Sequence, residues 1–479
     1  MRFDKRLAAV FGFVILAGSV VFAEEKQAVK LTLDDAVEYA LKNSRTLKSS
    51  DIDLEMKKRA SSTSWNVFLP NVQASGTMSR ANDYNPSTAA MAQLGATVKW
   101  LAAGGQNSGT APASVATDYE NEEDRWSTIG ALSISWNFNP AYIAQIQKAK
   151  LDYEGGKISW EQSQNTTVLN IKKLFYGLLL QQENLKIQKD TLENARQRYV
   201  QAQANFKNGL VPEISLLQTQ VNYENTKPTV NTAEQTLRQN IDTLAFLIGL
   251  PVGTDIELAG EIEPSYVDVD TDSLLEKYGA NDLNIRSLQN NIDVINKSMA
   301  ALNLSTWVPS FALSYGLQPV YTGSDGAWHF YKGIGKDDEW YDSGSLSLTL
   351  AWNITNMLPW SATQQQIKDL RQTLSKLEIS METLKENQKV EVRKAVDTLN
   401  QAREQIDAMG RTVEVAKRAY DMQSRSYRNG TTEFLDLKDT ESSYNQAKLG
   451  LLNQKMNYIT ALMDLENTLN TELSGSQKN

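Results

Sequence analysis

The sequence contains one long unit twice, and this internal repeat restricts the possible folds more than any other feature. The segment Phe206-Lys207-Asn208-Gly209 recurs as Tyr427-Arg428-Asn429-Gly430, at an offset of 221 residues that holds without a gap on both sides. The flanking residues Leu192, Glu193, Ala195, Tyr199, Ile214, Leu216 and Tyr223 correspond to Val413, Glu414, Ala416, Tyr420, Leu435, Leu437 and Tyr444. Tandem copies of one unit are expected to fold as copies of one motif. We therefore expect two equivalent halves joined near Pro251 to Pro264.

Each copy predicts a long helical hairpin, because apolar residues recur there every seven positions. The rows are Ile171, Leu178, Leu185, Leu192, Tyr199 and Phe206 in the first copy, and Val392, Leu399, Ile406, Val413, Tyr420 and Tyr427 in the second. A sustained seven-residue period is typical of coiled coils. A helix from about Ala141 to Asn208 would be ~100 Å long at 1.5 Å per residue. The Asn-Gly steps would end each helix, since both residues tolerate the left-handed conformation of a C-cap.

Before each long helix the apolar period changes from seven to two, which predicts β-strands. Leu132, Ile134, Trp136 and Phe138 alternate with small or polar residues, as do the ranges 311–317 and 346–354; the strand near Val72–Met78 is weaker. One apolar and one small polar face fit a transmembrane barrel with a wet lumen. Such barrels need at least eight strands, and open edges in lipid leave backbone groups unsatisfied. Four strands per chain must therefore be shared, giving eight, twelve or sixteen strands with two, three or four chains.

The composition argues against most enzyme chemistry and against nucleic-acid binding. The chain has no cysteine, a single histidine (His329) and a formal net charge of −9. Disulfides, thiolate sites and two-histidine metal sites within one chain are thereby excluded, and an acidic balance without a basic stripe disfavours phosphate binding. We expect no enzymatic activity, no cofactor and no metal.

Asp268, Asp270 and Asp272 alternate like the start of a calcium loop. Ser273 stands where such a loop requires glycine, so we expect Asp272 or Thr271 to cap a short helix instead.

The first 23 residues predict a secretory signal peptide. Arg2, Lys5 and Arg6 precede a short apolar run, and Val21 and Ala23 supply the small residues of a cleavage site. We expect the following organisation: signal peptide 1–23; first repeat 24–250, with strands at about 67–82 and 126–139 and a helical hairpin at about 141–249; linker 251–270; second repeat 271–479, with strands at about 307–321 and 344–354 and a hairpin at about 361–472.

Two copies of two strands followed by a long helical hairpin resemble the TolC-like outer membrane efflux protein family, the outer membrane factors. The specific marks are the turns Phe206-x-x-Gly209 and Tyr427-x-x-Gly430, followed by Ile214-Ser215-Leu216 and Leu435-Asp436-Leu437. The resemblance implies a mixed α and β fold, in which four strands contribute to a shared transmembrane β-barrel and the hairpins form a periplasmic α-barrel. It also implies a homotrimer in the outer membrane that extends into the periplasm.

The same resemblance implies a function and a set of site residues. The chain would be an exit duct for efflux or type I secretion, working with a periplasmic adaptor protein and an inner-membrane transporter. The hairpin tips would dock the adaptor through Phe206, Asn208, Gly209, Leu210, Tyr427, Asn429, Gly430 and Thr431. Asp436 and Asp439 stand where related channels carry inward-facing acids, and they would form the pore constriction and favour cations.

Three alternatives remain open at the level of the sequence, of which the most remote is an enzyme that uses carboxylates alone. Glu433 and Asp436 could merely complement the positive end of a helix dipole, in which case no acidic ring exists. The whole chain could instead be a soluble, elongated periplasmic coiled-coil scaffold or adaptor with an accessory β-domain. An arginine in place of Leu348 would separate the channel from the soluble scaffold, because only a membrane-embedded strand would fail to assemble with it.

Overall fold

The computed structural model describes residues 29–80, 126–321, 331, 334 and 340–473. The chain forms two compact units, and each draws on both sequence repeats. One unit consists of residues up to 49 together with 162–279 and 389–479, and the other of 50–161 and 280–388. The units do not coincide with the repeats because the longest helices contribute residues to both. The predicted signal peptide, most of both predicted strand-connecting loops and His329 lie outside the described residues.

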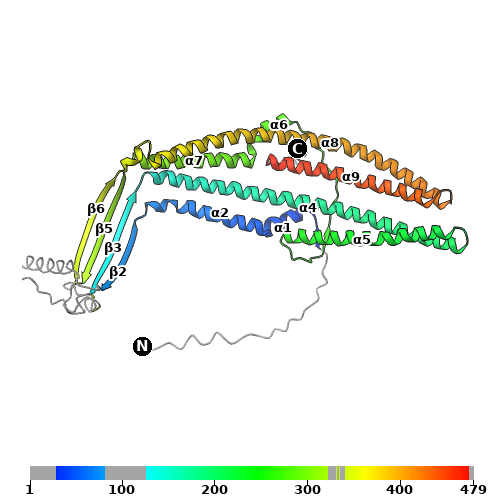
Figure 1. Cartoon of the computed structure of the whole chain (residues 1–479), viewed down its shortest axis with the longest axis horizontal. Coiled ribbons are helices and arrows are strands. Elements are labelled where there is room, and N and C mark those ends of the chain that lie inside the picture. The colour runs from blue at the N-terminus through cyan, green and yellow to red at the C-terminus, as the bar shows by residue number, and fades with distance from the viewer. Residues whose placement is uncertain (1–28, 81–125, 322–330, 332–333, 335–339, 474–479) are drawn as a thin grey trace, which may run out of the picture. The chain divides into compact units, whose positions relative to one another are not determined.

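The unit of residues 50–161 and 280–388 contains an antiparallel sheet of four strands in the order β2-β3-β5-β6 (Figure 1). The strands are β2 (Asn71–Arg80), β3 (Trp126–Phe138), β5 (Ser310–Tyr321) and β6 (Trp340–Ala351). Short 3-10 helices precede β2 and follow β6, at η1 (Ser64–Phe68) and η7 (Ile354–Met357). The sheet thus takes two strands from each copy, and β2 and β6 are its edges.

The register of the sheet separates its side chains into an apolar face and a small polar face. Ile134 of β3 lies opposite Tyr315 of β5, which lies opposite Leu346 of β6. Residues directly opposite one another in antiparallel strands point to the same side, so the apolar rows of the strands align. On the other face Ser135 is opposite Ser314, and the hydroxyl groups of Ser314 and Ser347 are 2.6 Å apart. The predicted alternation is therefore confirmed across the strand pairs.

Long helices form two hairpins, as the seven-residue period predicted. The first consists of α4 (Ala141–Lys207) and α5 (Glu213–Leu247), and the second of α8 (Ala362–Arg428) and α9 (Phe434–Thr468). The heptad residues Leu178, Val392 and Leu399 are at most 2% exposed. Ala195 and Ala202 are also buried, and such small side chains let helix backbones approach closely. Among the described residues, no helix is both long enough and apolar enough to cross a membrane.

The remaining helices and strands complete the two units. In the unit of residues 50–161 and 280–388 lie α7 (Leu283–Trp307) and most of α2 (Arg45–Thr63). The other unit contains α1 (Leu33–Asn43), α6 (Thr271–Tyr278) and a parallel pair formed by β1 (Val29–Leu31) and β4 (Ile256–Leu258). Its core includes Leu31, Phe175, Leu178, Leu244 and Ile248. The β1–β4 pair was not foreseen, because strands of three residues are too short to display a period of two.

The cap of α6 differs from the expectation. The helix begins at Thr271, and the side chain of Asp270 accepts hydrogen bonds of 3.0 Å from the backbone N–H and the hydroxyl of Ser273. These bonds lower the pKa of Asp270 below its ordinary value. Asp272 and Thr271 lie inside the first turn and were the wrong choice, since the N-cap is the residue that precedes the first turn of the helix.

Candidate functional site: the two hairpin tips

Both hairpin tips are built by the same hydrogen-bonded turn. After α4, the N–H of Gly209 donates to the carbonyl of Phe206 at 2.9 Å, and the N–H of Leu210 donates to that of Asn205 at 2.8 Å. After α8, Gly430 and Thr431 donate in the same way to Tyr427 and Ser426, each at 3.0 Å. This paired pattern is a Schellman motif, which requires a left-handed residue after the helix. Gly209 and Gly430 supply it, with φ angles of 70° and 74°.

A stack of two tyrosines closes each hairpin behind its tip. The rings of Tyr199 and Tyr223 are 5.9 Å apart and those of Tyr420 and Tyr444 are 5.8 Å apart, with interplanar angles of 14° and 13°. The ammonium groups of Lys227 and Lys448 lie over the rings of Tyr223 and Tyr444, respectively. All three pairs of equivalent residues are 221 positions apart. The repeat is therefore preserved in side-chain contacts as well as in backbone geometry.

The predicted docking residues lie at the exposed ends of these hairpins. Leu210 is 71% exposed although it is apolar, and Phe206 is 40% exposed. At the second tip Tyr427 is partly buried against the ring of Phe434, with centroids 6.3 Å apart, and this burial raises its pKa above the ordinary value. The remaining members of the predicted set, Asn208, Gly209, Asn429, Gly430 and Thr431, are exposed.

Asp436 and Asp439 lie on one exposed face at the start of α9. Leu437 and Glu441, which follow them closely, point into the protein and are 2% and 5% exposed. The hydroxyl of Thr432 donates to Oδ2 of Asp436 at 3.1 Å. Glu433 occupies the N-cap position but makes no capping hydrogen bond with its side chain. Asp436 lies within the first turn, where a helix dipole acts, whereas Asp439 lies beyond it. The dipole therefore does not account for Asp439.

Sequence reasoning missed a buried ionic network close to these aspartates. Nη1 of Arg198 on α4 lies 2.5 Å from Oε2 of Glu441 on α9, and both side chains are less than 10% exposed. The amide of Asn194 donates to Oε1 of Glu441 at 2.8 Å, and Arg198 also reaches the hydroxyl of Tyr420 at 3.5 Å. This network joins the first hairpin to the second within one unit. Its only sequence signal is a departure from the repeat, which has Ala419 opposite Arg198 and Gln220 opposite Glu441.

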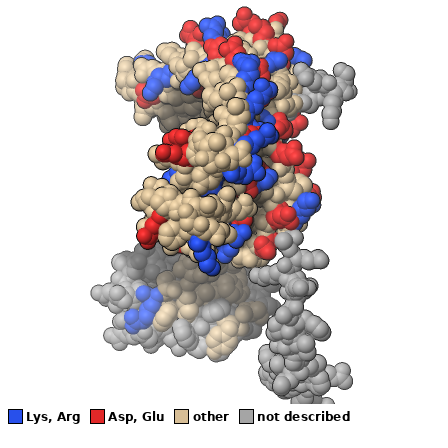
Figure 2. Space-filling model, turned by 90° about the vertical axis from the view of Figure 1, so that its right-hand side faces the viewer, with Lys and Arg blue, Asp and Glu red and all other residues tan. Residues whose placement is uncertain are grey.

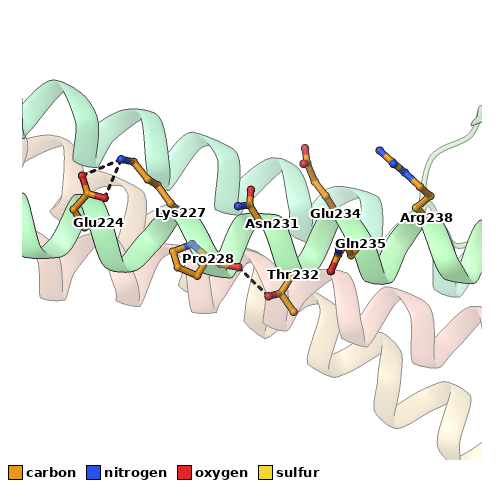
Figure 3. A pocket seen from close by; sticks show the side chains of 8 residues that line it. All are labelled: Glu224, Lys227, Pro228, Asn231, Thr232, Glu234, Gln235 and Arg238. Atoms are coloured by element: carbon orange, nitrogen blue, oxygen red, sulfur yellow. Dashed lines mark hydrogen bonds and ion pairs between the residues drawn. The ribbon is translucent and has the colours of Figure 1, made fainter.

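One surface depression of this unit is formed by a single helix and does not gather convergent chemistry. The depression in Figure 3 is lined by residues of α5 alone; Glu224 pairs with Lys227 at 2.9 Å, and Thr232 donates to the carbonyl of Pro228 at 2.9 Å. The face in Figure 2 carries acidic and basic side chains interspersed with one another. Within the described part of the chain, no three acidic or histidine side chains are grouped so as to hold a metal ion.

Known proteins were compared with the whole chain. The outer membrane efflux protein family matches residues 36–250 and 274–471, which cover both copies. The CmeC outer membrane channel of Campylobacter jejuni superposes with a TM-score of 0.69 and 16% identity, over 91% of this chain and 85% of that one. VceC of Vibrio cholerae gives 0.68 and 12%, over 92% and 96%. A search of curated protein sequences found no match.

The open-state MtrE channel of Neisseria gonorrhoeae gives a TM-score of 0.65 at 16% identity, over 92% of this chain and 89% of that one. These likenesses establish the fold, and the family match covers most of the sequence. The predicted mixed fold, the channel role and the location in the outer membrane with extension into the periplasm agree with both. The chain belongs to the outer membrane efflux protein family.

Proposed function

We propose that three copies of this chain form an exit duct for efflux or type I secretion, working with a periplasmic adaptor and an inner-membrane transporter. The observation that carries the proposal is the four-stranded sheet, whose apolar and polar faces are cleanly separated and whose edge strands are β2 and β6. In lipid each unpaired backbone group costs several kcal/mol, so these edges need partners. Three copies supply twelve strands, with the apolar face toward lipid and the serine-rich face toward water.

A cysteine cross-linking experiment counts the copies, because the natural chain contains no cysteine. Ser75→Cys on β2 and Ser347→Cys on β6 would be combined and joined by a short bismaleimide. Two strands separate β2 from β6 within one chain, a distance of roughly 14 Å at ~4.8 Å per strand. Linkage across the seam between copies is therefore favoured. We expect a ladder on a denaturing gel that stops at three chains.

Either single variant is the control, because each seam joins β2 of one copy to β6 of the next and two copies of Ser75 do not meet. A ladder that stops at two or four chains, or one that continues without limit, would contradict the trimer.

We further propose that Asp436 and Asp439 of the three copies constrict the periplasmic entrance of the duct. Both side chains are exposed on one face of α9, opposite buried Leu437 and Glu441. Rings of carboxylates favour cations. The first copy has Ser215 and Gln218 at these positions, so the ring would come from the second hairpin alone.

Single-channel recording in planar bilayers tests the constriction. The double variant Asp436→Asn, Asp439→Asn should keep discrete conductance steps and lose cation selectivity, seen as a shift of the reversal potential toward zero in a salt gradient. Asp369→Asn, which removes an exposed acid on a different helix, α8, should leave the reversal potential unchanged. Unaltered selectivity in the double variant would leave the two aspartates without a role in the pore.

We propose that the tips dock the adaptor through Phe206, Asn208, Gly209, Leu210, Tyr427, Asn429, Gly430 and Thr431. The support is an apolar, highly exposed Leu210 held on a hydrogen-bonded turn. A photoreactive amino acid at position 210 should cross-link to a periplasmic adaptor in native cells, whereas one at position 225 on α5 should not. Cross-links to other copies of this chain alone would contradict docking at the tip.

We propose the division of the chain given by the repeat: a signal peptide at 1–23, repeats at 24–250 and 271–479, and a linker at 251–270. Amino-terminal sequencing of the protein purified from outer membranes should begin at Glu24. A sequence beginning at Met1 would contradict cleavage.

A further inference from the structure

A groove lies where three helices meet in the unit of residues up to 49, 162–279 and 389–479. Its walls are α1, the stretch of α4 from 164 to 172, and the end of α9 with the residues that follow it. Its volume is about 630 Å³, within the range of roughly 300–1,000 Å³ that small-molecule sites occupy. Asp436 and Asp439 lie at the other end of α9. The groove is therefore separate from the hairpin tips and from the proposed constriction.

Contacts between the walls fix the shape of this groove. Ala40 anchors α1 in the core and is fully buried. The side-chain amide of Asn165 on α4 donates to Oδ1 of Asn470 at 2.7 Å, and Asn470 ends α9 in the left-handed conformation with a φ of 46°. Lys173 of α4 also pairs with Asp464 of α9 at 2.5 Å. A preformed groove binds a ligand with little loss of conformational freedom.

Part of the groove lining is apolar, and this property belongs to the first repeat. The apolar lining residues are Val37, Leu41, Val168, Leu169 and Met463. At the repeat offset of 221, Val168 corresponds to Lys389 in the second copy. Met463 corresponds to Asp242 in the first hairpin at the same offset. Both counterparts are charged, so the shared hairpin fold does not require apolar residues at these positions.

The polar part of the lining is predominantly acidic. Its charged residues are Asp34, Glu38, Glu466, Glu472 and the single cation Lys172. Among the described residues, Asp34 and Glu472 form no ion pair, and both are exposed. The end of α9 adds the partial negative charge of a helix C-terminus. Burial, and then the charge of Asp34, raise the pKa of Tyr176. The groove therefore favours a positive ligand.

We propose that this groove binds a small amphipathic organic cation, that is, an apolar body that carries one positive charge. The apolar body would contact Val168 and Met463 and lose its contact with water, which supplies affinity. The positive charge would lie near Asp34 and Glu472, and these carboxylates select the sign of the ligand. Within the described part of the chain no acidic groups are grouped to hold a metal ion, so a bare divalent cation does not fit. This inference does not rest on the proposed channel.

Two probe ions of the same shape and opposite charge test the proposal. Tetraphenylphosphonium is the cation and tetraphenylborate is the anion. Binding of each to the purified chain in a nonionic detergent would be measured by isothermal titration calorimetry, with detergent micelles alone as the blank. We expect the phosphonium to bind at least about tenfold more tightly than the borate, and its affinity to fall as salt is added.

A matched pair of double variants locates the binding site. Asp34→Asn, Glu472→Gln removes two exposed acids of the groove and should weaken phosphonium binding about tenfold. Asp190→Asn, Asp421→Asn removes two exposed acids elsewhere, on α4 and α8, and should leave the affinity unchanged. Val168→Lys introduces the residue of the second copy and should abolish binding, with circular dichroism to show that the variant is folded.

Three results would overturn the groove as a cation site. These are equal affinity for the two probe ions, an equal loss of affinity in the two double variants, and no phosphonium binding by the natural chain. The second of these would mean that the whole acidic surface attracts the cation. The proposed duct is judged separately by its conductance in planar bilayers. Absent conductance with intact phosphonium binding would contradict the duct and leave the groove in place.

Discussion

The two hairpin tips have the same backbone but different charges. Each ends in a Schellman turn around a glycine and is closed by a tyrosine pair with a lysine over one ring. The second hairpin alone carries Asp436, Asp439 and Glu441, where the first has Ser215, Gln218 and Gln220. The shared features are those needed to reverse a long helix. The charges differ at the start of the returning helix, where only the second hairpin would form the proposed acidic constriction.

The comparison also shows how the different charges are held. Glu441 is buried and depends on Arg198 of the first hairpin, which has no arginine counterpart in the second. Because Glu441 is two residues after Asp439 on α9, its pairing fixes the helix that carries the proposed constriction. The two hairpins therefore differ at a matched pair of positions: the first has Arg198 where the second has Ala419, and the second has Glu441 where the first has Gln220.

The largest expected effect comes from removing one partner of this buried pair. Arg198→Ala leaves the Glu441 carboxylate buried without its cation, which costs about 3–5 kcal/mol of unfolding free energy. The double variant Arg198→Ala, Glu441→Gln restores the residues of the repeat counterparts and should recover much of that loss. Thermal unfolding followed by circular dichroism measures both.

The exposed pair of Arg196 and Glu193 is the control, and Arg196→Ala should change the melting temperature little. A double variant that is as unstable as the sum of the single variants would show that the two residues do not depend on each other.

The next effect tests whether the two turns are equivalent in energy as well as in geometry. Gly209→Ala and Gly430→Ala each place a Cβ in the left-handed conformation and should each cost about 1–2 kcal/mol. Gly177→Ala and Gly410→Ala lie inside helices with no heavy atom within 4 Å of the new Cβ, so these should stabilise by about 0.5–1 kcal/mol. Unequal costs at the two turns would break the equivalence of the tips.

The sequence predicted the parts of the molecule that follow a period or a repeat. Alternating residues such as Leu346, Leu348 and Leu350 predicted the sheet, and the spaced residues Leu178 and Leu399 predicted the buried helix rows. The Asn-Gly steps located both turns, since few residues adopt a positive φ. Each of these signals is local, or is repeated at a constant offset, and can be read without knowing what packs against it.

The unforeseen parts depend on contacts between distant residues. Arg198 and Glu441 are 243 positions apart, and nothing local distinguishes them from the solvated charges of a helix surface. The pairing of β1 with β4 joins Val29 to Ile256 through three residues each, too few for a pattern. The cap of α6 was misassigned because Asp270 and Asp272 are chemically alike and only the helix start separates them. Whether Asp436 and Asp439 face a pore depends on neighbouring copies.

A smaller effect should distinguish the two tyrosine pairs. Tyr199→Leu and Tyr420→Leu each remove a stacked pair, which contributes about 0.5–1.5 kcal/mol beyond the burial of the ring. Tyr420 also accepts the contact from Arg198, whereas Tyr199 stacks without it. We therefore expect the lower melting temperature for Tyr420→Leu. Equal melting temperatures for the two variants would show that the ionic network gains nothing from the tyrosine hydroxyl.

The smallest expected effect is a dependence of stability on pH in the acid range, caused by Glu193 of the first hairpin. Hydrogen bonds from Arg196, and then from Gln197, lower the pKa of Glu193 to about 2 from its ordinary value of 4.5. A carboxyl group whose pKa is lower in the folded state stabilises the fold above its unfolded pKa, and this contribution is lost as the pH falls toward 2. Glu193→Gln should therefore melt at a lower temperature than the natural protein at pH 7, and this difference in melting temperature, the gap, should close between about pH 4.5 and pH 2.

The gap should be slight, since the carboxylate is in contact with water and salt screens it. Melting curves across this pH range measure the difference in melting temperature. Glu414→Gln is the equivalent change in the second hairpin and serves as the comparison. A gap for Glu193→Gln that stays constant with pH would mean that its side chain contributes by packing rather than by charge.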